Sequence, residues 1–209
     1  ADHCKPSGEY CFKYSDNDVI GWFKDYRQGI THTFTSRKHS SFTQAEREQF
    51  KQRIQRERDS RNKRLQRERK QAANKAKNIW ENSKRGDHAY LQKKQVPGEA
   101  TRIYKRKLVV PAFKDGEFTS LQFISQDGDK RFLRNGDIKG AFGSLGKDTS
   151  RIYIAEGYST AASIADVTDA VSVWAFNANN LEPVAKTLAK KHPHSEIIIC
   201  ADNDAKTEG

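Results

Sequence analysis

The sequence predicts an α/β protein in which an antiparallel sheet and a parallel sheet follow one long helix. Residues 151–204 alternate strand-like apolar runs with helical segments, the order of a parallel sheet with right-handed crossovers. Residues 101–145 have the period of strands broken by Asp-Gly turns, and residues 43–84 have a charged helical pattern. We therefore expect four segments: a small β-rich module at 1–42, a long charged helical segment at 43–86, a basic antiparallel meander at 87–147 and a parallel-sheet domain at 148–209.

Composition indicates an anionic partner. The 209 residues carry a formal net charge of +11 and a pI near 9.6, which favours nucleic acid, although a solvated basic surface is the alternative. The cysteines are an odd set of three, and the sequence has neither a signal peptide nor an apolar run that could span a membrane. We expect a cytoplasmic protein without a membrane partner. Because the chain has no Met, we also expect it to be an internal piece of a longer one.

Short β-prone runs at Glu9–Tyr14 and Val19–Phe23 predict a small antiparallel sheet in the first module. Aromatic and basic residues alternate there in a pattern that resembles a surface for stacking single-stranded bases. The alternative is that the aromatics form the core of the module. The residues concerned are Trp22, Phe23, Tyr26 and Phe34 with Lys24, Arg27, Arg37 and Lys38.

The same module contains possible zinc ligands. His3, Cys4 and Cys11 are one loose half of a four-ligand set, which His32 and His39 could complete in space. Ordinary reduced cysteines and surface histidines are the simpler interpretation, so we expect no zinc here.

A capping box at Thr43–Glu46 predicts a helix that runs to about Asn82 or Lys84, on the order of 60 Å long. Its apolar positions are sparse, so only its ends should dock and its middle should lie in solvent. Basic residues outnumber acidic ones along it, which fits either a solvated spacer or a rod that binds phosphates. A further short helix is expected at His88–Gln95.

The meander is predicted from β-prone runs separated by Asp-Gly pairs, which adopt the positive φ angles that tight hairpins need. A short strand should then lead into the parallel sheet. The expected strands are Lys107–Phe113, Phe118–Ser125, Lys130–Leu133 and Ala141–Leu145.

Three carboxylates carry the predicted chemistry. Glu156, Asp202 and Asp204 each follow an apolar strand of the parallel sheet, so they should converge at its carboxyl edge. Carboxylates held together repel unless a cation is shared between them, and oxygen-only ligands favour Mg²⁺ or Mn²⁺. Two such ions could stabilise the attacking and leaving oxygens of phosphoryl transfer. The alternative is that these acids cap the helices that follow the strands.

The motifs Ile152–Tyr158 and Ile197–Asp204 together resemble the Toprim domain of bacterial-type DNA primases, topoisomerases and some nucleases. Lys107–Pro111 and Lys130–Leu133 are similar to the basic β-rich subdomain that precedes Toprim in bacterial primases. The stretch Gly21–Gly29, the charged helix and Trp80 further resemble primases of conjugative plasmids and phages. The resemblance implies a Rossmann-like Toprim fold, truncated here because its last strand, helix and further acidic pair would lie beyond Gly209.

Carried onto this sequence, the resemblance implies that Glu156 is a metal ligand or a general acid/base and that Asp202 and Asp204 hold catalytic Mg²⁺. It implies that Lys130 and Arg131 contact phosphates of the template or nucleotide. Lys139 is another basic candidate for contacts to phosphates. Replicative primases usually carry an Asp in the position of Thr160, so the resemblance does not extend to a third metal site here.

The expected function is that of a primase core, which synthesises short RNA primers from nucleoside triphosphates on a single-stranded DNA template in a Mg²⁺-dependent reaction. A replicative helicase is a candidate partner. Two alternatives stay open: a Toprim nuclease, and a non-catalytic module that binds single-stranded nucleic acid. Topoisomerase is disfavoured because the sequence shows no catalytic-tyrosine domain, and whether this piece is active alone is left open.

Overall fold

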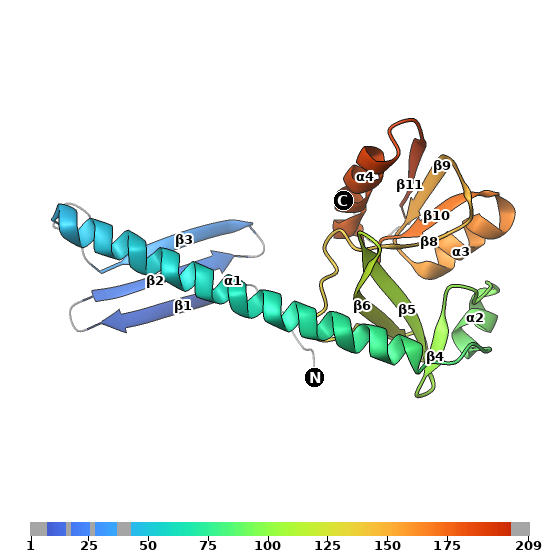
Figure 1. Cartoon of the computed structure of the whole chain (residues 1–209), viewed down its shortest axis with the longest axis horizontal. Coiled ribbons are helices and arrows are strands. Elements are labelled where there is room, and N and C mark those ends of the chain that lie inside the picture. The colour runs from blue at the N-terminus through green and yellow to red at the C-terminus, as the bar shows by residue number, and fades with distance from the viewer. Residues whose placement is uncertain (1–7, 16–17, 26–27, 37–42, 202–209) are drawn as a thin grey trace. The chain divides into compact units, whose positions relative to one another are not determined.

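The computed structural model describes residues 8–15, 18–25, 28–36 and 43–201. The chain forms two compact units, Ala1–Arg61 and Asn62–Gly209, and the division falls within the long helix α1. The predicted α/β class is confirmed, with three sheets and four helices in the described residues (Figure 1). Among those residues, none of the helices combines the length and the apolar character that a membrane span requires.

The first unit contains the antiparallel sheet that the sequence predicts. Its strands are β1 (Gly8–Ser15), β2 (Asp18–Asp25) and β3 (Ile30–Thr35), in the order β1-β2-β3. The register is continuous, since Gly8 pairs with Asp25 and Asp25 pairs with Ile30 at one end of the sheet.

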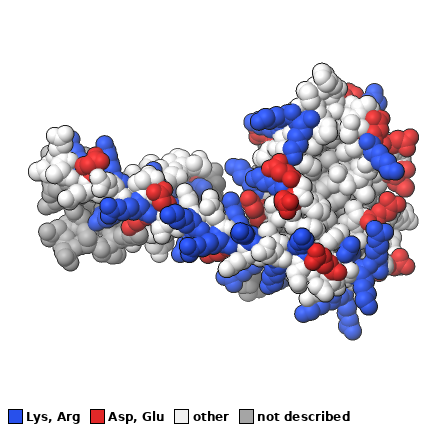
Figure 2. Space-filling view, viewed as in Figure 1, with Lys and Arg blue, Asp and Glu red and all other residues white. Residues whose placement is uncertain are grey.

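Helix α1 (Gln44–Glu81) begins directly after Thr43, as the capping box predicts, and ends within a turn of the expected position. Its side chains are exposed from residue 55 to residue 67, whereas Ala72, Ala76 and Ile79 near its end are buried. The predicted solvated middle is therefore confirmed. The helix carries thirteen Lys and Arg against six Asp and Glu, and Figure 2 shows the basic side chains along its length.

In the second unit, the meander forms a four-stranded antiparallel sheet with the order β4-β5-β6-β7. At the β5–β6 turn, Asp115 and Gly116 both have positive φ, 53° and 84°, which is why the sequence places Asp-Gly there. Strand β4 lies outside the predicted strands. The elements are α2 (Ala89–Lys94), β4 (Arg102–Tyr104), β5 (Lys107–Lys114), β6 (Glu117–Ile124) and β7 (Lys130–Phe132).

The last sheet has the order β11-β9-β10-β8. Strands β9, β10 and β11 are parallel, as predicted, but β8 pairs antiparallel with β10. Helix α3 packs with the core that the meander shares, and α4 covers the opposite face of the sheet. The elements are β8 (Gly143–Leu145), β9 (Asp148–Ala155), α3 (Tyr158–Val167), β10 (Ala170–Trp174), α4 (Ala178–Lys191) and β11 (Glu196–Cys200).

The two sheets of the second unit share one hydrophobic core. Leu108 and Val110 of β5, Tyr158 of α3 and Trp174 of β10 all belong to it. The buried Trp174 indole N–H also joins the sheets by donating to the Pro111 carbonyl at 3.3 Å. The Tyr158 hydroxyl of α3 donates to the carbonyl of Pro97, between α2 and β4, at 2.7 Å. The meander is consequently held against the carboxyl edge of the parallel strands.

Candidate active site at the carboxyl edge of the parallel sheet

The three parallel strands end level with one another. Ala155, the last residue of β9, lies opposite both Trp174 of β10 and Cys200 of β11. Glu156 follows Ala155 directly, is half-buried, and its carboxylate has no hydrogen bond or ion pair within the described residues. Glu156 therefore presents an uncommitted carboxylate at the edge where ligands of parallel sheets bind.

Asp202 and Asp204 lie outside the described residues. The structure follows β11 to Cys200 and the chain to Ala201, beside the end of β9. Within the described part of the chain, no three His, Cys, Asp or Glu side chains gather as a possible metal site. Of the predicted ligand set, the structure thus places Glu156 alone.

Lys130 reaches the same edge from the meander. Its Nζ atom lies 3.5 Å from the point that a Cβ atom would occupy at residue 157, next to Glu156. The ammonium also lies 6.0 Å from the ring centroid of Tyr90, within the range of a cation–π interaction. Tyr90 is 4% exposed, and its hydroxyl lies 3.2 Å from the Ser159 hydroxyl of α3 in a hydrogen bond. The buried Tyr90 ring therefore helps to hold the Lys130 ammonium near the start of α3.

Arg131 and Lys139 do not join this group. Side chains alternate along a strand, so Arg131 leaves β7 on the face opposite to Lys130, the face that packs towards α1 through Phe123 and Leu133. Lys139 is exposed on the loop between β7 and β8, where its carbonyl accepts a hydrogen bond from the Lys114 ammonium at 3.4 Å. Only Lys130 of the three predicted basic residues reaches the edge in the described structure.

Gly157 caps the amino end of α3 with φ −110° and ψ 155°, angles that any residue adopts. A Cβ there would meet the Lys130 ammonium at ordinary contact distance. The glycine is therefore not required by the backbone at this position. The next residue, Tyr158, is buried, and burial raises the pKa of its hydroxyl to about 12.

The segment after β10 forms a second wall that sequence reasoning missed. Phe176 has a φ of 74° and stacks edge-on against Phe132 of β7, with ring centroids 5.7 Å apart. Asn180 of α4 is 3% exposed, and its amide holds three backbone groups: it accepts from the Gly140 N–H at 2.7 Å and donates to the Ala141 and Ala175 carbonyls, both at 2.9 Å. The available signal for this hydrogen-bonded link was the group of three asparagines at positions 177, 179 and 180.

The possible zinc ligands do not converge where the structure describes them. Cys11 and His32 lie on opposite faces of the first sheet, because Cys11 pairs with Trp22 whereas His32 pairs with the next residue, Phe23. These two side chains cannot share one ion. His3, Cys4 and His39 lie outside the described residues.

The donor chemistry at the carboxyl edge fits a hard divalent cation. Glu156 supplies an oxygen ligand without a competing partner, and the sequence continues from the neighbouring strand into two further carboxylates at Asp202 and Asp204. His and Cys, the ligands of softer metals, are not part of this set. Lys130 next to it suits an anionic ligand such as a phosphate.

Comparison with known proteins defines the class of this domain. Residues 151–209 match the Toprim domain family, so the chain contains a Toprim domain. The chain is also similar to two Escherichia coli proteins named DNA primase TraC. One is 36% identical over 124 residues, which is 55% of this chain and 9% of the relative, and the other is 33% identical over 109 residues, 49% of this chain and 10% of the relative. No solved structure matches the chain.

The matched segments thus span about a tenth of the length of these relatives. The predicted resemblance to Toprim primases is confirmed at this level.

Proposed function

We propose that this chain is part of a primase that synthesises short RNA primers on a single-stranded DNA template. The Toprim match and the likeness to DNA primase TraC support a function of the primase type. The observation that carries the proposal is the position of the Lys130 ammonium beside Glu156-Gly157, since a polymerase site must hold a triphosphate next to its metal ligands.

Glu156, Asp202 and Asp204 would hold Mg²⁺ or Mn²⁺ at the carboxyl edge. From Cys200 the chain needs only two residues to reach Asp202, a span of at most about 7 Å, which supports a shared site with Glu156. When bound, the ions would offset the negative charge that develops on the phosphate oxygens.

The residues of the chain would contribute binding and orientation. Lys130 would hold the triphosphate of the incoming nucleotide, with its ammonium oriented by the Tyr90 ring and by the bond between Tyr90 and Ser159. The 3′-hydroxyl oxygen of the primer would attack the α-phosphorus, the bond to pyrophosphate would break, and the hydroxyl proton would pass to solvent or to Glu156. Positioning the reactants in line and stabilising the developing charge together account for most of such catalysis.

The proposal is tested by Asp202→Asn, Asp204→Asn and Glu156→Gln in the full-length protein. Each substitution keeps side-chain size and removes one negative charge, so incorporation of labelled ribonucleotides on a single-stranded template should fall to background. Lys139→Gln, which removes a charge from an exposed loop, should leave synthesis within about twofold. Unchanged synthesis in the acidic variants would refute the proposal, and template cleavage in place of synthesis would indicate a Toprim nuclease.

A further inference from the structure

The sheet of the first unit has one face built from aromatic side chains. Residues that lie directly opposite each other on neighbouring strands share a face. One cross-strand row pairs Tyr10 with Phe23 and Phe23 with His32, and the next pairs Phe12 with Gly21 and Gly21 with Phe34. The aromatic face is therefore made of Tyr10, Phe12, Phe23, His32 and Phe34.

These rings contact one another and are open to solvent. Ring centroids are 5.8 Å apart for Tyr10 and Phe12, 6.4 Å for Phe12 and Phe34, and 5.3 Å for Phe23 and His32, whose planes are nearly parallel. Tyr10 is 76% exposed, Phe34 54%, Phe23 46% and Phe12 43%. Large aromatic side chains are normally buried, so a contiguous exposed group of this kind marks a binding surface.

Gly21 shapes the aromatic face. A Cβ atom at this position would overlap the Phe12 ring and come within 2.7 Å of the Cys11 carbonyl. The glycine thus lets the Phe12 ring lie across strand β2, between Tyr10 and Phe34. The Phe12 ring is tilted by 42° against Tyr10 and meets Phe34 edge-on at 78°.

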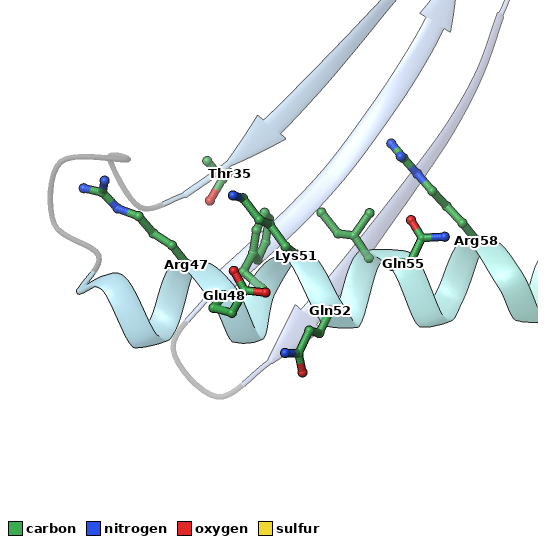
Figure 3. A pocket seen from close by; sticks show the side chains of 9 residues that line it. Thr35, Arg47, Glu48, Lys51, Gln52, Gln55 and Arg58 are labelled. Carbon is green, nitrogen blue, oxygen red and sulfur yellow. The ribbon is translucent and has the colours of Figure 1, made fainter.

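The opposite face of the same sheet is occupied by α1. There the Arg61 guanidinium lies 5.7 Å from the ring centroid of Trp22. A groove of about 810 Å³ between Thr35 and the first turns of α1 is lined by Arg47, Lys51 and Arg58, among others (Figure 3). The long helix therefore covers the Trp22 side and leaves the aromatic face without cover among the described residues.

We propose that the aromatic face binds single-stranded DNA by stacking its bases on the exposed rings. Each base has a π-face, and exposed aromatic side chains on a sheet are the standard platform for unpaired bases. The choice of DNA as the ligand rests on the proposed function, in which a single-stranded template must be held. The sequence pattern predicts that Trp22 and Phe23 share one stacking surface. In the structure, Phe23 lies on the aromatic face and Trp22 lies on the opposite face, beside α1.

Charge supports a nucleic acid over a second protein surface. The first unit has twelve Lys and Arg against nine Asp and Glu, and the part of α1 that belongs to this unit carries six Lys and Arg against four Asp and Glu. The net charge of the first unit is therefore positive, which favours an anionic partner. Among the described residues, the face itself carries no Lys or Arg, so its own contribution to binding is stacking.

The test measures binding of a fluorescently labelled single-stranded oligonucleotide to the full 209-residue chain, in EDTA and without nucleotides. The triple variant Tyr10→Leu/Phe12→Leu/Phe34→Leu keeps apolar volume and removes the rings. Affinity should fall by about tenfold or more for each ring lost. The matched variant Phe12→Tyr/Phe34→Tyr keeps the rings and should bind within about twofold of wild type.

Two further readouts separate stacking from other modes. Wild type should bind an abasic oligonucleotide of equal length as weakly as the leucine variant binds DNA. The slope of log affinity against log salt should be the same in wild type and the leucine variant, because no phosphate contact has been removed. If the triple variant loses its structure by circular dichroism, Tyr10→Leu alone, at the most exposed ring, carries the test.

Equal DNA affinity in the leucine variant and wild type would overturn the proposal. So would a wild-type dimer, detected by light scattering, that the leucine substitutions dissociate while DNA binding persists, since the face would then pair two protein copies. The assay contains no divalent ion and no nucleotide, so it does not depend on primer synthesis. Glu156→Gln should bind DNA normally even where it abolishes synthesis.

Discussion

At the scale of single residues, Lys130 and Arg131 are sequence neighbours with the same charge and different surroundings. Both are exposed, but Lys130 points to the carboxyl edge beside Gly157 and Arg131 points to the other face of β7. A resemblance to basic primase segments assigns both to phosphate binding and cannot separate them. The alternation of side chains along β7 separates them, because it places the two residues on opposite faces.

This difference predicts unequal effects on nucleotide binding. Lys130→Met should raise the KM for nucleoside triphosphates about tenfold or more in primer synthesis, because a charge-assisted contact to phosphate is lost. Arg131→Met removes the same charge from the opposite face of β7 and should change the KM less than about threefold. Equal effects of the two substitutions would show that Lys130 acts only through long-range charge.

Tyr158 links burial to pH. Its pKa in the folded state is about 12, above the ordinary value of 10.0, so the folded chain holds the phenolic proton more tightly than the unfolded chain does. The stabilising contribution is complete below pH 10 and is lost as the pH rises through 12. We therefore expect the free energy of unfolding to fall more steeply between pH 10 and 12 in wild type than in Tyr158→Phe.

The measurement is denaturant unfolding at several pH values from 9 to 12. Lysines titrate in the same range in both proteins, so the difference between the two curves isolates Tyr158. At pH 9 the Phe variant should be less stable by about 1 kcal/mol, because the hydrogen bond to the Pro97 carbonyl is missing. Parallel curves would contradict the burial of this hydroxyl.

At the scale of elements, α4 is fixed to the site through one buried amide. Asn180 holds backbone groups of the loop before β8 and of the segment after β10. Asn180→Ala would leave three buried backbone groups without this partner and should destabilise the protein by about 2 to 4 kcal/mol. Asn179→Ala, at the exposed neighbour on the same helix, should cost less than about 0.5 kcal/mol. Urea unfolding of the two variants gives their midpoints. Similar shifts in both would contradict the stabilising role of the Asn180 amide.

Local patterns predicted most of these elements. The capping box at Thr43 gave the start of α1, and the Asp115-Gly116 pair gave the β5–β6 turn, because both depend on backbone chemistry within a few residues. Strand β4 has three residues and was missed, since so short a run has no measurable period. The antiparallel direction of β8 was also missed, because side-chain alternation is the same in either direction.

The candidate site was predictable only where its residues lie next to a motif. Glu156 follows a strand and could be read directly, whereas Tyr90 reaches Ser159 across 69 positions of sequence. The aromatic face could have been found from alternation alone, since Tyr10 and Phe12 must share a face and Trp22 and Phe23 cannot. What alternation could not tell is which face α1 covers.

At the scale of the whole molecule, the largest basic excess and the predicted catalytic acids lie in different parts of the sequence. Helix α1 accounts for an excess of seven positive charges in a chain whose net charge is +11, and the three predicted catalytic acids all lie in the Toprim domain. The structure divides the chain into two compact units, and the division into four segments stays a prediction. Template binding and nucleotide chemistry should therefore be separable by substitution.

The central claim is that Glu156, Asp202 and Asp204 bind divalent cations together beside Lys130. A crystal of the full-length protein soaked in Mn²⁺, with anomalous diffraction recorded at the manganese edge, tests this directly. The account predicts anomalous density at the ends of β9 and β11, with oxygen atoms of all three carboxylates about 2.2 Å from the ions. Absence of density there, with the carboxylates pointing away from one another, would contradict it.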